Sequence, residues 1–185
     1  TTDHGYVFGA YEFWSKARKR GITPIIGVEA YLTPGTHRSD RTRVRFGDDP
    51  ANRDDVGGGG AYTHMTILAR TTEGMHNLFR MSSLASLEGH YFKPRIDREL
   101  LRRFSDGLIA TTGCVGGEIQ TKLRVGQYAA AREAAAEFRD IFGAGNFYAE
   151  VMDHGLPIER QTQRELLRLA TDLGLPLLAT NDLHY

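Results

Sequence analysis

The chain has 185 residues, of which 41% are hydrophobic and 25% charged, as is typical of one soluble globular domain. Its 23 Lys and Arg residues equal its 23 Asp and Glu residues, so net charge provides no general attraction to nucleic acid. The single cysteine, Cys114, excludes an intramolecular disulfide and fits a reducing compartment. No apolar run approaches the roughly 18 residues of a membrane span, and no signal peptide is visible. We therefore expect a cytoplasmic protein without membrane contact.

In the first third of the chain, apolar spacing predicts a helix over residues 8–20 that places Trp14 and its aromatic neighbours in the core. A β-branched run then predicts a buried strand over residues 22–32. Residues 34–60 are charged and rich in glycine, which predicts a flexible loop. The loop's arginines, which include Arg38, are balanced by aspartates, so we expect solvated side chains. Contact between these arginines and a DNA backbone is the alternative.

The rest of the chain alternates strands with helices. We expect strands at residues 64–69, 107–112, 146–152 and 175–180, and helices at 75–84, 98–104, 126–142 and 158–173. This alternation with short connections predicts an α/β fold around a parallel sheet, either open or closed as a barrel. In such folds the chemistry lies at the carboxyl ends of the strands.

Residues able to bind metal occur at the ends of these predicted strands. Glu29 lies near the end of the first strand and Cys114 follows the third. Asp182 and His184 follow the last strand, whereas His64 stands at the start of its strand and is the exception. We therefore expect several of these side chains to meet at one rim of the sheet.

Each of these residues also has a purely structural interpretation. His64 alone suits a hydrogen-bonded structural histidine, and Asp3-His4 suits a helix cap. The segment Asp182-Leu183-His184 suits a polar turn after a buried strand. Glu29 is less easily explained, because a carboxylate inside an apolar strand is costly unless it is paired or bound to metal.

Taken together, the candidates offer nitrogen, oxygen and sulfur ligands, the mixture expected for zinc or manganese. The set is His4, Glu29, His64, Cys114, Asp182 and His184. Several metal ions held by such a cluster lower the pKa of bound water and stabilise charge on a phosphate ester. The sequence therefore predicts hydrolysis of a phosphomonoester or a phosphodiester.

Motifs along nearly the whole chain, apart from the glycine-rich loop, resemble the PHP (polymerase and histidinol phosphatase) domain of bacterial DNA polymerase III alpha subunits. They occupy residues 2–5, 21–31, 64–69, 74–78, 91–96, 112–118, 150–155 and 179–185. The arginine-rich loop and alanine-rich helix suggest a high-GC bacterium such as an actinobacterium. On this resemblance, residues 1–185 are expected to form one PHP segment that lacks its first strand and its C-terminal end.

The resemblance implies a distorted (β/α)7 barrel that holds up to three metal ions: Zn²⁺, or else Mn²⁺ or Mg²⁺. Its motifs imply a catalytic role for Glu29, Asp182 and His184, and six metal ligands, with Glu29 bridging two metals. These ligands are His4, Glu29, His64, Cys114, Asp182 and His184. Asp3 would orient His4. Cys114 stands where PHP phosphatases usually have histidine, and a thiolate there favours zinc.

The function that the resemblance implies is metal-dependent 3′–5′ exonuclease proofreading at a primer 3′ end in an intact DNA-directed DNA polymerase. Partners such as the sliding clamp would bind through the rest of that polymerase. The family's opening His-x-His motif is absent, so we expect the segment alone to be inactive.

Two rival functions remain open: a stand-alone PHP phosphatase for a small phosphomonoester, and a non-catalytic, metal-stabilised scaffold. Motifs at residues 74–78 and 91–96 favour the polymerase branch, and the full ligand set argues against pure scaffolding. Two smaller questions also stay open. Lys93-Pro94-Arg95 either contacts phosphate or only turns the chain, and His154 is a substrate-side or supporting residue rather than a ligand.

Overall fold

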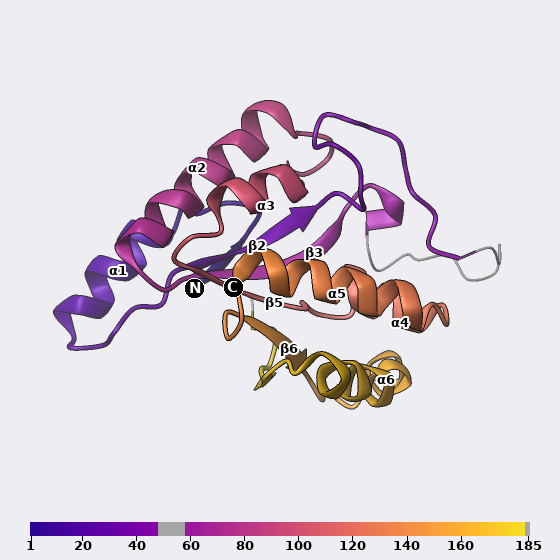
Figure 1. The fold of residues 1–185 in the computed structure, drawn as a ribbon. Coiled ribbons are helices and arrows are strands. Elements are labelled where there is room, and N and C mark those ends of the chain that lie inside the picture. The colour runs from indigo at the N-terminus through magenta and orange to yellow at the C-terminus, as the bar shows by residue number, and fades with distance from the viewer. Residues whose placement is uncertain (48–57, 184–185) are drawn as a thin grey trace.

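A computed structural model describes residues 1–47 and 58–183 as a curved sheet with helices packed against it (Figure 1). The strands lie in the order β1 (Thr2–His4), β2 (Gly27–Leu32), β3 (Thr63–Ala69), β5 (Leu108–Thr111), β6 (Phe147–Val151) and β7 (Leu177–Ala179). A short β4 (Arg95–Ile96) pairs with β2 beyond the end of β1. This mixed α/β architecture confirms the expected fold class.

The helices are α1 (Ala10–Lys19), α2 (Thr72–Glu88), α3 (Arg98–Phe104), α4 (Glu118–Arg124), α5 (Tyr128–Phe142) and α6 (Pro157–Leu173), with a 3-10 turn, η1 (Gly58–Gly60). Figure 1 shows α2 and α3 together above the sheet, α5 beside them, and α6 beside β6. Among the described residues no helix is both long and apolar enough to cross a membrane.

The sheet is mixed, not parallel throughout as predicted. β1, β2 and β4 are parallel, as are β5, β6 and β7, but β3 runs antiparallel to both β2 and β5. A parallel return usually needs a helical crossover, and the described part of the connection from β2 to β3 contains only η1. The reversal places the start of β3 at the end of β2, with Thr63 opposite Leu32. His64 therefore lies at the expected rim and is no longer an exception.

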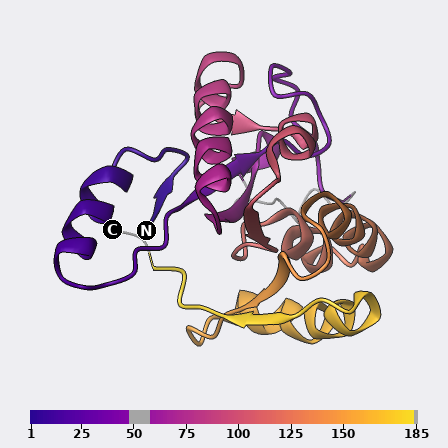
Figure 2. The ribbon, with the colours of Figure 1, turned by 60° about the vertical axis from the view of Figure 1, so that its left-hand side comes forward.

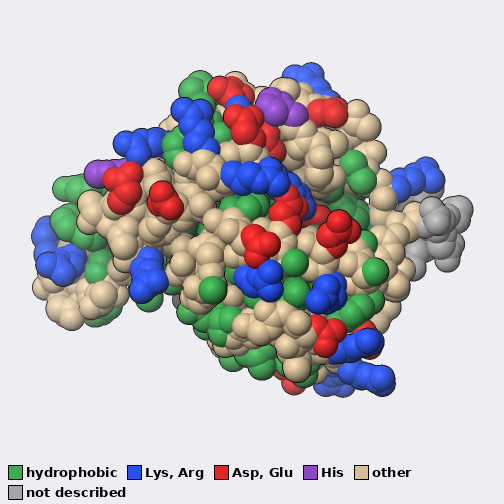
Figure 3. Space-filling view, viewed as in Figure 1, with side chains coloured by type: hydrophobic (Ala, Val, Ile, Leu, Met, Phe, Trp, Pro, Cys, Tyr) green, Lys and Arg blue, Asp and Glu red, His purple; other side chains and the backbone are tan. Residues whose placement is uncertain are grey.

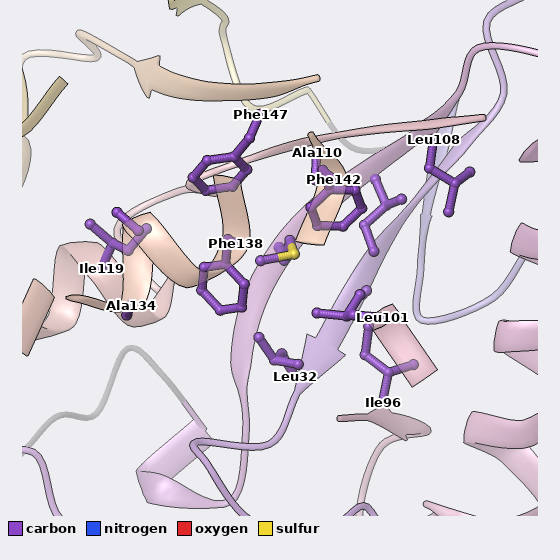
Figure 4. Close-up of a cluster of buried hydrophobic side chains, with 14 of the residues drawn as sticks. Leu32, Ile96, Leu101, Leu108, Ala110, Ile119, Ala134, Phe138, Phe142 and Phe147 are labelled. Carbon is purple, nitrogen blue, oxygen red and sulfur yellow. The ribbon is translucent and has the colours of Figure 1, made fainter. Parts of the chain in front are cut away.

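The two faces of the sheet have opposite characters because side chains alternate along each strand. One face is apolar and packs on the helices, and Phe138 and Phe142 of α5 meet Phe147 of β6 there (Figure 4). The residues that the strands contribute to it include Val28, Ala30, Leu32, Met65, Ile67, Leu108, Ala110, Phe147 and Ala149. The opposite face, called the polar face below, carries Glu29, Tyr31, His64, Thr66, Thr111 and Glu150.

The first helix forms as predicted, but its aromatic residues are not in the core. Tyr11 is 77% exposed and Trp14 44% exposed, and only Ala10 and Ala17 of α1 are buried. Figure 2 shows the reason: α1 stands to one side beside the edge strand β1, away from the other helices. The strands β1 and β4 were not expected, because each is too short to show a periodic pattern, and the helix α4 was not expected either.

Arg38 is buried, which corrects the expectation of a solvated arginine. Its guanidinium lies 3.0 Å from Asp97, 2.9 Å from Glu99 and 2.6 Å from Glu88. The Arg38 backbone N–H also donates to Asp97, whose carboxylate accepts from the Leu100 N–H and so caps α3. The chain after β2 is thereby anchored to α2 and α3. Residues 48–57 of the predicted flexible loop lie outside the described residues.

Removing this anchor should destabilise the fold in a pH-dependent way. Burial alone would raise the pKa of Asp97, but N–H groups of Leu100 and Arg38 and the Arg38 charge hold it below its ordinary value. Arg38→Ala should lower the free energy of unfolding by about 3–5 kcal/mol at pH 7, because it leaves a buried carboxylate without its cation. Urea unfolding followed by circular dichroism measures this loss.

The loss of stability in Arg38→Ala should depend on pH, because it arises from the ionised Asp97 carboxylate. A carboxylate with a lowered pKa stabilises the fold above its unfolded pKa of about 4, and this contribution is lost as the pH falls through the folded value. The difference in the free energy of unfolding between wild type and Arg38→Ala should therefore become smaller as the pH is lowered. Arg45→Ala, at an exposed arginine of the same segment, should change stability by less than about 0.5 kcal/mol. A difference that stays constant with pH would contradict the assignment.

Candidate metal centre

The centre is built around Glu29, the third residue of β2, which is 4% exposed. Pairing of β1 with β2 sets His4 opposite Glu29, and pairing of β2 with β3 sets His64 opposite Tyr31, two residues along the same face. The Oε1 atom of Glu29 lies 2.8 Å from Nδ1 of His64, and its Oε2 atom contacts Nδ1 of His4. One carboxylate thus meets two histidines from two strands.

Cys114 reaches the same point from the loop that follows β5. The loop lies close against β3: the His64 N–H donates to the Gly116 carbonyl over 3.0 Å. Gly113 has a φ of 76°, and a Cβ there would lie 2.7 Å from the His64 carbonyl oxygen, so the approach requires glycine. The Cys114 sulfur is 3.5 Å from Nδ1 of His64. Ligand atoms of Glu29, His64 and Cys114 all lie within 4.8 Å of one another.

Electrostatics favour a charged cluster here. Burial opposes ionisation of Glu29, but hydrogen bonds and charge from His64 and then His4 outweigh it and lower the pKa of Glu29 to about 2. Burial likewise opposes protonation of His64, whereas Cys114 and Glu29 raise the pKa of His64 to about 10. Without a metal ion, the positive charge of a protonated His64 therefore balances the Glu29 carboxylate.

The residues present fit a metal ion. They supply one oxygen, one nitrogen and one sulfur ligand from a partly buried group, the kind of set that binds zinc. Glu29 offers a different carboxylate oxygen to each histidine, so His4 lies beside the group on the β1 side. Four of the six predicted ligands therefore come together.

Asp182 lies on the polar face but outside this tight group. It lines a cavity of about 260 Å³, together with Thr2, Thr66, Leu68, Thr111, Glu150, Leu178, Thr180, Asn181 and Leu183. Figure 2 shows the segment beyond β7 extending back toward β1. His184, the remaining predicted ligand, lies outside the described residues.

His154 holds this last segment in place. Its Nδ1 lies 2.5 Å from Glu159, and its Nε2 lies 3.0 Å from the carbonyl oxygen of Asn181, next to Asp182. The hydrogen bond to Glu159 is the main reason that the pKa of His154 is raised. His154 therefore supports the Asp182 segment, in line with the expectation that it is not a ligand.

Asp3 does not orient His4 as expected. Neighbouring residues of a strand point to opposite faces, so Asp3 turns away from the polar face. Its carboxylate accepts hydrogen bonds from the Gly9 N–H over 2.8 Å, at the start of α1, and from the Thr1 hydroxyl. Asp3 therefore ties β1 to Gly9, the residue before α1, but it is not the N-cap residue of that helix.

Glu150 is a polar-face residue that sequence reasoning missed. It is 4% exposed and accepts hydrogen bonds from the Thr111 hydroxyl over 2.5 Å and the Thr180 hydroxyl over 2.6 Å. It lines the same cavity as Asp182. The signal was available, because Glu150 is a carboxylate inside an apolar strand, as Glu29 is.

Two further groups of charged residues, one around His37 and one around Arg95, have structural roles. Asp97 and Glu99 face His37 at 3.8 and 3.6 Å, but Arg38 already neutralises both carboxylates, so this group needs no metal. Arg95 is 1% exposed and donates to the carbonyl oxygens of Gly89, Ala61 and Arg38, which is a structural role. Lys93 instead lies 5.3 Å from the centre of the Tyr31 ring, beside the metal centre.

Comparisons with a family model and with curated proteins agree with each other. The model of the PHP domain family matches residues 1–154. The chain is 54% identical over 190 residues to DNA polymerase III subunit alpha of Saccharopolyspora erythraea. It is 51% identical over 185 residues to that of Mycobacterium leprae, and 52% to that of Mycobacterium tuberculosis. Each match covers 100% of this chain but only 16% of the relative.

Metal binding should protect Cys114, the chain's single cysteine, from alkylation. Zn²⁺ should slow its reaction with iodoacetamide, because a coordinated thiolate is no longer a free nucleophile. Glu29→Gln should raise the Zn²⁺ concentration needed by at least about tenfold, since even outer partners of metal ligands contribute 10–100-fold. Peptide mapping of the alkylated protein measures the protection. His37→Ala should not change it, and equal protection in Glu29→Gln would contradict the proposed ligand set.

Proposed function

The chain belongs to the PHP domain family, and we propose that it is part of the PHP domain of a DNA polymerase III alpha subunit and carries a metal-dependent phosphodiester hydrolase site. Similarity to such subunits over the whole chain supports this placement. The chain spans about 16% of these relatives, so DNA polymerisation is proposed for the intact protein and not for this segment. In that protein the site would remove the last nucleotide of a primer 3′ end.

The observation that carries the proposal is the convergence of Glu29, His64 and Cys114 within 4.8 Å. Bound metal would lower the pKa of a water molecule and stabilise negative charge on the phosphate. Glu29 presents its two oxygens toward different histidines and so suits a bridging role. Asp182 and His184 would complete the catalytic set with Glu29, in a site for up to three ions. The thiolate of Cys114 favours Zn²⁺ over Mn²⁺ or Mg²⁺.

The chain's own residues would prepare the site for the reaction. Burial of Glu29 between the strands keeps solvent from its carboxylate, and Tyr31 is hydrogen-bonded to the same carboxylate. Burial and the Glu29 charge raise the pKa of Tyr31, so its hydroxyl stays protonated near neutral pH. The cavity beside Asp182 gives the polar face room for a nucleotide phosphate. Partners such as the sliding clamp would bind elsewhere on the intact cytoplasmic polymerase.

A second candidate is a non-catalytic scaffold. The metal-ligand group joins β2, β3 and the loop after β5, so an ion there would also tie three parts of the fold together. Zinc sites of this kind stabilise domains without catalysis. A stand-alone phosphatase is less favoured, because the chain's similarity to polymerase subunits covers its full length.

Asp182→Asn in the intact protein separates these functions. We expect it to slow metal-dependent trimming of a mismatched primer 3′ end by at least about 100-fold, because a ligand contributes more than outer partners worth 10–100-fold. Polymerisation of a matched primer should be unchanged. Gel analysis of a 5′-labelled primer–template measures both rates, with metal content determined for each protein.

The matched control is Asp153→Asn. Asp153 is another carboxylate that follows a strand, but it is exposed and caps only the Gly155 N–H. Its trimming rate should equal that of wild type. Trimming by Asp182→Asn at the wild-type rate would contradict the hydrolase proposal. Bound metal without trimming by wild type or either variant would support the scaffold.

A further inference from the structure

A tight turn at residues 91–93 presents an exposed aromatic ring, and Lys93 of the same turn lies over the Tyr31 ring beside the metal centre. The turn is closed by a hydrogen bond from the Tyr91 N–H to the Lys93 carbonyl oxygen, 3.0 Å long. Phe92, at its tip, has a φ of 61° and is 66% exposed. Left-handed backbone is unfavourable for a bulky residue and is found mainly where function requires it.

Burial does not account for this conformation. Among the described residues, the Phe92 ring lies against one other ring, that of Tyr91, with 4.5 Å between centroids. Glycine would adopt the same φ without strain. The exposed phenyl group is therefore held in place at a cost to the backbone, which indicates that the ring itself has a use.

Cations surround the two rings. The guanidinium of Arg43 lies 5.6 Å from the centre of the Phe92 ring, and that of Arg41 lies 5.7 Å from the centre of the Tyr91 ring. Lys93 follows Phe92 directly and lies over Tyr31. In the described part of the chain, none of these three cations forms an ion pair with a carboxylate.

This local excess of positive charge contrasts with the rest of the molecule. The chain is neutral overall, and Figure 3 shows acidic and basic side chains interspersed over the visible face. Elsewhere Arg38 is paired with Asp97 and Arg98 with Glu118. Cations that have no carboxylate partner among residues 1–47 and 58–183, placed beside exposed rings, therefore mark this turn as a binding surface for an anion that also has flat faces.

The turn is connected to the metal centre through Tyr31. β4 pairs with β2 in the register that sets Arg95 opposite Tyr31, so the turn at residues 91–93 comes just before the point where the chain pairs with Tyr31. The Tyr31 ring packs edge-on against His64 with 5.5 Å between centroids, and Lys93 lies 5.3 Å from the same Tyr31 ring. Tyr31 therefore links Lys93 to His64, and a strand bound across Phe92 and Lys93 would lead toward the metal centre.

We propose that Tyr91, Phe92 and Lys93, with Arg41 and Arg43, form a stacking platform for single-stranded DNA that leads its 3′ end to the metal centre. An unpaired base would stack on the Phe92 ring, and the three cations would contact the adjoining phosphates. Stacking on aromatic rings combined with a basic groove is how proteins bind single strands without reading sequence. This role deepens the proposed hydrolase function and rests on it for the polarity of the strand.

Crosslinking to the intact protein in EDTA tests the platform without any hydrolysis. The probe is oligo-deoxythymidine with 5-iododeoxyuridine at the 3′-terminal positions, and the adduct is located by peptide mapping. We expect an adduct on Tyr91 or Phe92. An adduct confined to other segments, including the exposed rings of α1, or none at all, would overturn the proposal. A surface that serves a protein subunit would give the latter result.

Phe92→Gly separates binding from folding. It should weaken crosslinking at this site about 5- to 100-fold, the effect of losing one stacked base. Its melting temperature should be unchanged or higher, because glycine relieves the left-handed backbone. A lower melting temperature would show that the ring is structural and would overturn the proposal.

Phe8→Ala is the matched control. Phe8 is 83% exposed and packs against Tyr6 with 4.6 Å between ring centroids, but no cation of residues 1–47 and 58–183 lies over its ring. This variant should leave crosslinking at residues 91–93 unchanged. Because the assay excludes metal, the absence of an adduct at residues 91–93 in the wild-type protein refutes the platform, whereas a normal adduct without metal-dependent trimming refutes only the hydrolase.

Discussion

The burial of one carboxylate, Glu29, is the constraint around which this domain is arranged. A buried, uncompensated charge would cost several kcal/mol, and the fold offsets that cost by bringing histidines from both neighbouring strands to the two oxygens. This is possible only in the observed register, which sets His4 opposite Glu29 and sets His64 two residues further along. Shifting either strand by one residue would turn its histidine to the apolar face.

The direction of β3 follows from the same requirement and could not be read from the sequence. Local periodicity identified a strand near residues 64–69, and the strand is there, but period-2 patterning is the same for both strand directions. Antiparallel pairing brings the start of β3 to the rim where β2 ends. His64 and Cys114, which are 50 residues apart, then meet through a glycine-dependent loop contact. Glu29 was predictable, because a charge in an apolar strand is a local signal; its neighbours depend on tertiary pairing.

Where sequence patterns failed, burial depended on partners that lie far along the chain. The aromatic spacing of α1 predicts a core helix, yet α1 lies beside an edge strand and buries only alanines. Arg38 lies in a segment whose composition is typical of a solvated loop, yet it pairs with Asp97 and Glu99, which come about 60 residues later in the sequence. By contrast, α3 and α6 were predicted closely, since capping residues and a continuous apolar stripe are encoded locally.

The distribution of unfavourable features along β2 gives the rim its functional character. On the helix-facing side the strands β2, β3, β5 and β6 contribute apolar side chains, and the buried Arg38 and Arg95 have acceptors. On the polar side β2 carries the buried carboxylate of Glu29 and Tyr31, whose pKa is raised. The segment that leads into β4, the partner of β2, adds Phe92, which has a left-handed backbone and a cation beside its ring. Because proteins keep such features only where something compensates for them, their concentration within one strand and its neighbours argues for ligands at this rim: cations at Glu29, and a polyanion at the turn that follows Tyr91.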